Sequence, residues 1–321
     1  MQAIVYRRYG PPEVLMVEEI EKPVPADNEV LLKVRAAALN PLDWHFLRGS
    51  PYGMRFMTGL AKPKIQSIGI DVAGQVEGVG SAVTLFQPGD DVFGSCRGAC
   101  AEFACAAETN LARKPANVSF EQAASVPVAA YTALQALRDK AHLQRGGRLL
   151  INGAAGGVGT FAVQIARWMG AQVTGVCSSR NVDLVRSLGA HQVIDYARQD
   201  FTEAAERYDV LLDCIGNHSI AASRRALSRS GIYVMVGAPS GRWVAPMDRS
   251  IAMQMLAPFV SQKLIGILAH WSQSDLALMS DLMASGKVTP VIDRTYNLRQ
   301  VPDAIRYLEG GHARGKVVIA V

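Results

Sequence analysis

Four glycines near the middle of the chain have the spacing of a phosphate-binding turn. They are Gly153, Gly156, Gly157 and Gly159, and they stand between the strand-like run 149–152 and the helix-like run 160–169. A turn without Cβ atoms lets backbone N–H groups and the positive end of a helix approach a pyrophosphate. Ala155 replaces the second glycine of the stricter fingerprint, so a plain glycine-rich connector is the alternative. The order strand, turn, helix favours a dinucleotide cofactor, and Ala155, Gly156, Gly157 and Val158 are the candidate phosphate contacts.

Three polar residues follow the next predicted strand, 172–177. A protein that binds NAD usually places an acid about 20 residues beyond the turn, on the ribose 2′-hydroxyl. Here the stretch reads Ser178, Ser179, Arg180, with two hydroxyls and a guanidinium that suit a 2′-phosphate. The alternative is that Arg180 is a solvated loop charge. We therefore predict NADPH as the cofactor.

No metal site is predicted. Cys96, Cys100 and Cys105 are spaced by four and five residues, whereas a closed zinc site requires four ligands and close pairs. The six histidines show no HxxxH or HExxH grouping. The cysteines are interpreted as buried fillers, with a metal or redox role as the alternative. Five cysteines in a chain without a visible export signal indicate reduced thiols, and so a cytoplasmic protein.

The elements that must position these residues alternate regularly in the middle of the chain. Strands are expected at 149–152, 172–177, 193–194, 209–214, 231–237 and 263–268, with helices at 158–169 and 182–188. Such alternation predicts parallel strands with crossover helices on both faces, a doubly wound α/β sheet. The first 120 residues instead read as short strands and turns.

The chain is expected to form two domains. The β-rich segment 1–124 and the tail 269–321 make one, because the tail is too short to stand alone, and residues 125–268 make the other. Small ligands usually bind in a cleft between two such domains. The net charge is +5, but the lysines and arginines are scattered along the sequence and form no basic stripe, so no nucleic-acid partner is expected. The longest apolar runs are strand-sized, so no membrane span is expected.

Several further motifs, in order, resemble the zinc-free quinone oxidoreductase branch of the medium-chain dehydrogenase/reductase superfamily. They lie at 37–43, 69–74, 88–92, 153–159, 213–216, 236–238 and 313–319, so the resemblance covers nearly the whole chain. It implies a GroES-like β domain built from both chain ends around a Rossmann domain. It also implies a homodimer that pairs edge strands, for which residues 263–268 are the candidate.

The resemblance also implies roles for single residues. Asn40 and Asp43 would lie near the nicotinamide and the substrate, with Tyr52 as a phenolic donor, unless Tyr52 only packs in its loop. The further cofactor-lining positions are Thr132, Tyr196, Gly216, Gly237, Ala238 and Lys316. For three of these a structural role is the alternative: Thr132 as a helix-entry hydroxyl, Tyr196 as a core-edge ring and Lys316 as a strand-edge charge.

The zinc ligands of the related alcohol dehydrogenases are absent at the matching motifs. Asn40-Pro41 replaces the first cysteine, and Gly69-Ile70-Asp71 replaces Gly-His-Glu. Without a Lewis acid, hydride addition to a conjugated acceptor is easier than reduction of a plain carbonyl, because charge spreads into an enolate. The predicted function is NADPH-dependent reduction of a small-molecule quinone or α,β-unsaturated carbonyl. The alternatives are an enoyl-thioester or carbonyl reductase of the same fold, and a non-catalytic NADPH-binding structural or sensor protein.

Overall fold

The computed structural model describes residues 1–237 and 247–321, and the chain divides into two units. One unit comprises Met1–Tyr131 together with Trp271–Val321, and the other comprises Thr132–His270. The division falls inside helix α4 (Pro127–Gln135).

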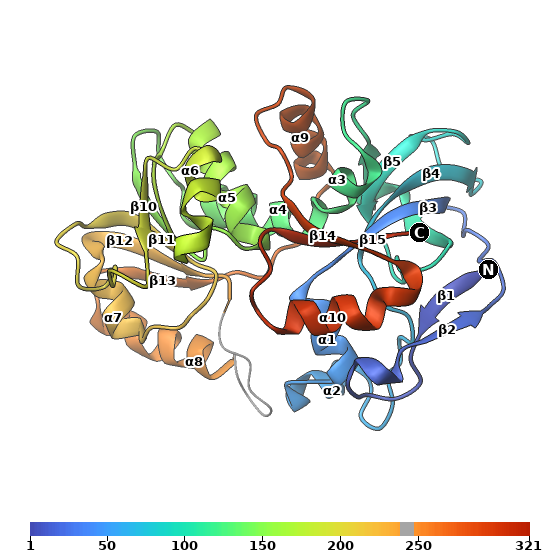
Figure 1. Ribbon diagram of the computed structural model, residues 1–321, viewed down its shortest axis with the longest axis horizontal. Helices are drawn as coiled ribbons and strands as arrows, with labels where there is room; N and C mark the ends of the chain where they lie inside the picture. Colours follow the sequence, from blue (N-terminus) through green and yellow to red (C-terminus); the bar gives the residue numbers. More distant parts are fainter. Residues whose placement is uncertain (238–246) are drawn as a thin grey trace. The chain divides into compact units, whose positions relative to one another are not determined.

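The Thr132–His270 unit is built on a parallel sheet with the strand order β10-β9-β8-β11-β12-β13. The strands are β8 (Arg148–Asn152), β9 (Gln172–Cys177), β10 (Gln192–Asp195), β11 (Tyr208–Asp213), β12 (Leu227–Met235) and β13 (Lys263–Gly266). The helices are α5 (Gly157–Trp168), α6 (Val182–Ser187), α7 (Ile220–Arg225) and α8 (Met247–Leu256). Figure 1 shows α5 and α6 on one side of this sheet and α7 and α8 on the other. This arrangement confirms the predicted doubly wound α/β fold.

Burial explains why these segments become central strands. Leu149, Leu150 and Ile151 of β8 are all fully buried, as are Leu211 and Leu212 of β11. Strands covered on both faces read as continuous apolar runs rather than alternating ones. The direction of the strand order reverses between β8 and β11, the position at which doubly wound sheets bind ligands beyond the carboxyl ends of their strands.

The other unit is mostly antiparallel. Its strands are β1 (Gln2–Val5), β2 (Met16–Glu19), β3 (Glu29–Leu39), β4 (Asp71–Val79), β5 (Asp91–Ser95), β6 (Phe103–Ala107), β7 (Leu111–Arg113), β14 (Ile292–Asn297) and β15 (Lys316–Ala320). Its helices, besides the first part of α4, are α1 (Pro41–Arg48), α2 (Arg55–Thr58), α3 (Phe120–Ala124), α9 (Gln273–Ala284) and α10 (Val301–Glu309). The larger sheet runs β14-β15-β3-β4-β5-β7, with β6 also paired to β3.

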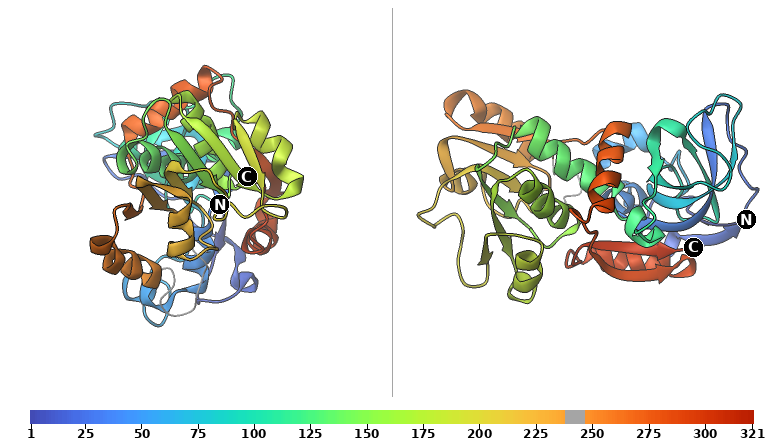
Figure 2. Two further views of the ribbon diagram at one scale, coloured as in Figure 1. Left: turned by 90° about the vertical axis from the view of Figure 1, so that its left-hand side faces the viewer. Right: turned by 90° about the horizontal axis from the view of Figure 1, so that it is seen from above.

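The closing strand β15 joins the two ends of the chain in this unit. β15 pairs antiparallel with β3, with Val317 opposite Leu39 and Ile319 opposite Ala37. All four of these side chains lie in one buried apolar cluster. Figure 2 shows both chain ends in this unit. The pairing also brings Lys316, at the start of β15, next to the end of β3.

The strand at which the predicted dimer would form is an edge strand. β13 pairs with β12 and stands last in the strand order of its sheet. Beyond it, the Leu268 side chain is 93% exposed. The homodimer itself stays a prediction, which light scattering of the purified protein would test. In the part of the chain that the structure describes, no helix has the length and apolar character needed to cross a bilayer.

Candidate functional site

The glycine turn between β8 and α5 is shaped by two of its glycines. Gly153 has a φ of 86°, in the left-handed region that favours glycine. A Cβ on Gly159 would lie 2.2 Å from the carbonyl oxygen of Gly153, so only glycine fits where the helix passes the turn. These two glycines allow the tight turn that joins the carboxyl end of β8 to the amino end of α5.

Gly156 is different, because no contact with the described part of the chain requires a glycine there. Its φ of −81° and ψ of 179° are open to any residue. A Cβ at this position would meet only the Gly153 carbonyl oxygen, at 3.4 Å. Among the described residues, the space beside this position at the amino end of α5 is therefore open. This is the arrangement that a pyrophosphate requires, so the turn fits a dinucleotide.

In the Thr132–His270 unit, four other predicted cofactor residues lie at the same edge of the parallel sheet as the glycine turn. Ser178, Tyr196, Gly216 and Gly237 all follow the carboxyl ends of parallel strands, namely β9, β10, β11 and β12. Carboxyl ends of parallel strands meet at one edge of a sheet. A pocket of about 500 Å³ opens beside Gly237, between the end of β12, α8 and β13. Thr132 lies in α4, and Ala238 lies outside the described residues.

A carboxylate that sequence reasoning missed stands beside the predicted 2′-phosphate contacts. Ser179 donates a hydrogen bond from Oγ to Asp195 Oδ2, at 2.7 Å. This bond lowers the pKa of Asp195, so the side chain is charged at neutral pH. Arg198 lies 3.5 Å from the same oxygen and offsets part of that charge. The only available signal was the position of Asp195 at the end of the third strand. Tyr196 next to it is 61% exposed and free to contact a ligand.

The β-rich unit contains a buried polar cluster in which Asn40 is central. Asn40 is 3% exposed and stands at the amino end of α1. Its Nδ2 donates to Asp71 Oδ2 at 2.9 Å, and its Oδ1 accepts from Lys316 Nζ at 2.6 Å. Both ends of the side-chain amide are thus held, and its orientation is determined by its neighbours.

Asp71 and Lys316 form a buried ion pair in this cluster. Lys316 Nζ lies 3.2 Å from Asp71 Oδ2, and the side chains are 3% and 0% exposed. The second oxygen of Asp71 accepts from the backbone N–H of Val128, at 3.0 Å. Burial raises the pKa of Asp71, and the Lys316 ammonium acts against that rise. The family resemblance predicts Lys316 as a cofactor contact. In the structure its ammonium group binds Asn40 and Asp71, and its role at the cofactor stays a prediction.

Asp43 joins the cluster through the backbone. Its Oδ2 accepts from the backbone N–H of Asn40 at 2.7 Å, and its Oδ1 accepts from that of Gly69 at 3.1 Å. The side chain is 2% exposed. Burial raises its pKa to about 7, and the nearby Asp71 carboxylate adds to the rise. The structure therefore brings Asn40 and Asp43 together, and it shows Asp43 anchoring the start of α1.

The raised pKa of Asp43 predicts a dependence of stability on pH. Its folded pKa of about 7 lies above the unfolded value of 3.8, so the fold favours the protonated form. This contribution to stability is complete below about pH 4 and is lost as the pH rises toward 7, by up to about 1.4 kcal/mol per pH unit. We expect the free energy of unfolding of the wild type, measured relative to that of Asp43→Asn by urea denaturation, to fall over this window. A difference that does not change with pH would contradict the assignment.

Tyr52 lies outside this cluster, in the short 3₁₀ turn Tyr52–Met54 that follows α1. Its ring packs on the guanidinium of Arg55, whose Cζ lies 4.7 Å from the ring centre. Arg55 also contacts the ring of Tyr9, at 4.5 Å. The Tyr52 side chain is 37% exposed. A role as phenolic donor to a substrate stays a prediction.

Comparison with known proteins gives the chain a family. The alcohol dehydrogenase GroES-like domain matches residues 26–134, and a zinc-binding dehydrogenase model matches residues 188–319. The chloroplast envelope quinone oxidoreductase homolog of Arabidopsis thaliana is 34% identical over 335 residues, covering 99% of this chain and 98% of that protein. The chloroplastic NADPH-dependent alkenal/one oxidoreductase of Arabidopsis thaliana is 33% identical over 338 residues, covering 99% of this chain and 79% of that protein.

A solved structure agrees over the full length. The Escherichia coli quinone oxidoreductase complexed with NADPH is 25% identical, with a TM-score of 0.86 and 100% of both chains covered. The chain therefore belongs to the medium-chain dehydrogenase/reductase superfamily. Within it, this chain is a homologue of the quinone oxidoreductases, which confirms the resemblance found from the sequence motifs.

One matching family model is named for zinc, yet the side chains here do not fit a catalytic zinc ion. Zinc prefers thiolate, imidazole and carboxylate ligands. Asn40 and Ile70 offer none of these, and the Asp71 carboxylate is engaged by Lys316, Asn40 and a backbone N–H. Across residues 1–237 and 247–321, no three His, Cys, Asp or Glu side chains are grouped so that they could hold a metal.

Proposed function

We propose that this protein reduces quinones or α,β-unsaturated carbonyl compounds with NADPH and without a metal. The observation that carries the proposal is the turn at Gly156, where the chain leaves room for a pyrophosphate at a helix end without needing glycine for itself. Relatives named as a quinone oxidoreductase homolog and as an NADPH-dependent alkenal/one oxidoreductase support the reaction class.

Different groups of residues would bind the cofactor and orient the reacting groups. Residues 155–158 would bind the pyrophosphate through backbone N–H groups, and Ser178, Ser179 and Arg180 would bind the 2′-phosphate. NADPH supplies the hydride when it is bound. Asn40, held in one orientation by Lys316 and Asp71, would orient the nicotinamide and the acceptor. Hydrogen-bond donors without a metal suffice for a conjugated acceptor, whose developing negative charge is spread over several atoms.

The reaction class is tested by following NADPH and NADH absorbance with purified protein against a panel of acceptors. We expect oxidation of NADPH with a quinone and an enone, little with a simple ketone, and the same rates after treatment with a chelator. Faster turnover of an enoyl thioester or the ketone would support the alternative reductases instead. Tight NADPH binding with no oxidation by any acceptor would support a non-catalytic role and contradict the proposal.

The cofactor assignment predicts a change in preference when Arg180 is replaced. Arg180→Ala is expected to lower the ratio of NADPH to NADH efficiency by roughly tenfold or more, because a charge-assisted hydrogen bond to the phosphate is lost. Arg186→Ala removes an exposed arginine of α6 that pairs only with Asp183 in the described structure, and it serves as the matched control. Steady-state kinetics with both cofactors measures the ratio. An unchanged ratio in Arg180→Ala would show that the 2′-phosphate lies elsewhere.

A further inference from the structure

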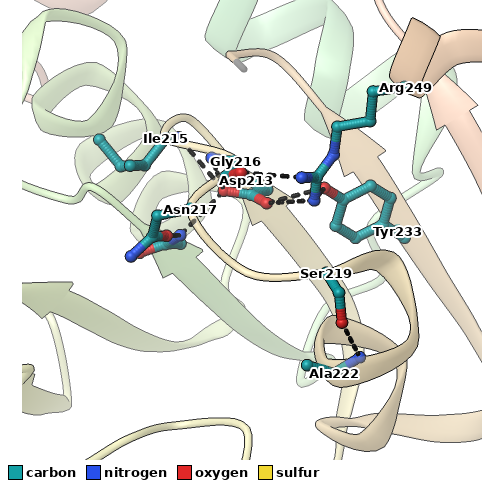
Figure 3. Close-up of polar contacts among 9 residues, drawn as sticks. Asp213, Ile215, Gly216, Asn217, Ser219, Ala222, Tyr233 and Arg249 are labelled. Carbon is teal, nitrogen blue, oxygen red and sulfur yellow. Dashed lines mark hydrogen bonds and ion pairs between the residues drawn. The ribbon is translucent and has the colours of Figure 1, made fainter. Parts of the chain in front are cut away.

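A second buried network lies beneath the cofactor edge of the parallel sheet, centred on Asp213. This carboxylate is 0% exposed and ends β11. Its Oδ1 accepts hydrogen bonds from Asn152 Nδ2 at 2.9 Å and from the backbone N–H groups of Ile215 and Gly216 at 3.2 and 2.8 Å. Figure 3 shows the contacts of Ile215 and Gly216 with Asp213. One side chain thus fixes the loop that follows β11.

Tyr233 and Arg249 complete the network from the other side. Tyr233, on β12, donates from its hydroxyl to Asp213 Oδ2 at 2.7 Å. Arg249, on α8, donates from Nη2 to the same hydroxyl at 2.8 Å and lies 3.6 Å from Asp213 Oδ2. Burial raises the pKa of Tyr233, and the Asp213 carboxylate raises it further, so the phenol keeps its proton. The hydroxyl can therefore donate to the carboxylate while accepting from the guanidinium.

Arg249 also holds the loop directly. Its Nη1 donates to the backbone carbonyl oxygen of Gly216, at 2.8 Å (Figure 3). Gly216 has a φ of 72°, in the left-handed region that favours glycine. Its hydrogen bonds help to hold this conformation. Its N–H is bound to Asp213 and its carbonyl to Arg249. Both polar groups of this residue are thus tied to charged side chains.

The same network supports three segments at the carboxyl edge of the sheet. Asn152, which donates to Asp213, directly precedes the glycine turn at Gly153. The backbone carbonyl of Asp213 accepts from the N–H of Gly237, at 3.1 Å. The glycine turn, Gly216 and Gly237 are the segments predicted to line the cofactor. Arg249 is the residue that links this edge to helix α8.

We infer that Arg249 is a positioning residue for NADPH, which it serves by clamping Gly216 and the Asp213–Tyr233 pair beneath the bound cofactor. The inference rests on the proposed function. Arg249 does not need to touch NADPH, because its side chain is only 14% exposed and its guanidinium donates to the loop carbonyl and to the Tyr233 hydroxyl. Its planar guanidinium holds two acceptors in a fixed geometry, whereas a lysine ammonium is a compact charge on a flexible chain and would hold them less firmly.

The test compares NADPH affinity in three variants by titration of the bound nicotinamide fluorescence. Arg249→Gln is expected to weaken NADPH binding roughly tenfold, while kcat at saturating NADPH stays within about twofold. Arg249→Lys is expected to recover part of the affinity. Arg224→Gln is the matched control, since Arg224 lies on α7 in the same unit and binds the side chain of Gln262 instead. Its affinity for NADPH should equal that of the wild type.

Hydrogen exchange separates positioning from a general loss of stability. Arg249→Gln should accelerate amide exchange in residues 214–217 while the exchange of β8 and β9 stays unchanged. If Arg249→Gln folds poorly, Tyr233→Phe, which removes only the bridging hydroxyl, should still weaken NADPH binding severalfold. A dissociation constant within twofold of the wild type in both variants would overturn the inference and leave the proposed function intact. A wild-type protein that fails to bind NADPH would overturn both.

Discussion

Replacing Lys316 with Met is expected to destabilise the β-rich unit by about 3–5 kcal/mol, because it leaves the Asp71 carboxylate buried without a cation. Asp71 is 0% exposed and would then have to stay charged in an apolar site or take up a proton. The Asn40 amide would lose one of its two partners as well. Urea denaturation of the wild type and the variant measures the difference in free energy of unfolding.

Two further variants sharpen this prediction. Lys22→Met removes an ammonium from an exposed ion pair with Glu77 in the same unit, and we expect a far smaller effect on stability. The double variant Asp71→Asn with Lys316→Met removes both charges, and we expect it to be more stable than Lys316→Met alone. The ion pair would be disproved as a stabilising feature if Lys316→Met cost no more than Lys22→Met.

The two glycines of the phosphate turn are expected to respond differently to alanine. Gly156→Ala should leave the unfolding temperature unchanged, because the added Cβ meets only one oxygen at 3.4 Å, yet it should weaken NADPH binding at least about tenfold by filling the ligand side. Gly159→Ala should lose both binding and stability, because its Cβ would lie 2.2 Å from the Gly153 carbonyl oxygen.

Calorimetric titration with NADPH and thermal unfolding distinguish the two effects. Gly78→Ala is the control, since an added Cβ on β4 meets no atom of the described residues within 4 Å and should change neither quantity. If Gly156→Ala bound NADPH as tightly as the wild type, the pyrophosphate would not approach the turn at that residue. Normal stability in Gly159→Ala would show that the turn tolerates a rearrangement that its backbone contacts do not suggest.

The architecture of the parallel sheet was predictable because buried strands and the glycine turn leave strong local signals. Leu149 to Ile151 form a short apolar run, and the turn follows it directly. Helix α1 was missed as a helix, although its signals were present in Asn40, Pro41, Asp43 and the left-handed Gly49 at its end. Asn40 and Asp43 were interpreted only as candidate site residues, so their role in capping the amino end of α1 was not predicted.

The charge networks could not be predicted, since burial comes from tertiary packing. Lys316 and Asp71 are 245 positions apart, and in a sequence a buried lysine looks the same as a solvated one. Arg249 has no motif of its own, and its partners Asp213 and Tyr233 stand on two different strands. Asp195 ends β10, and it contacts Ser179 only because β9 and β10 are neighbours in the sheet.

The central claim is most directly tested by the destination of the hydride. With NADPH carrying deuterium at the transferred position of nicotinamide C4, reduction of a simple enone by the purified, chelator-treated protein should give a saturated ketone with one deuterium on the β-carbon. Mass spectrometry and NMR of the product locate the label. Deuterium on the carbinol carbon of an allylic alcohol, or no labelled product at all, would contradict metal-free conjugate reduction by this protein.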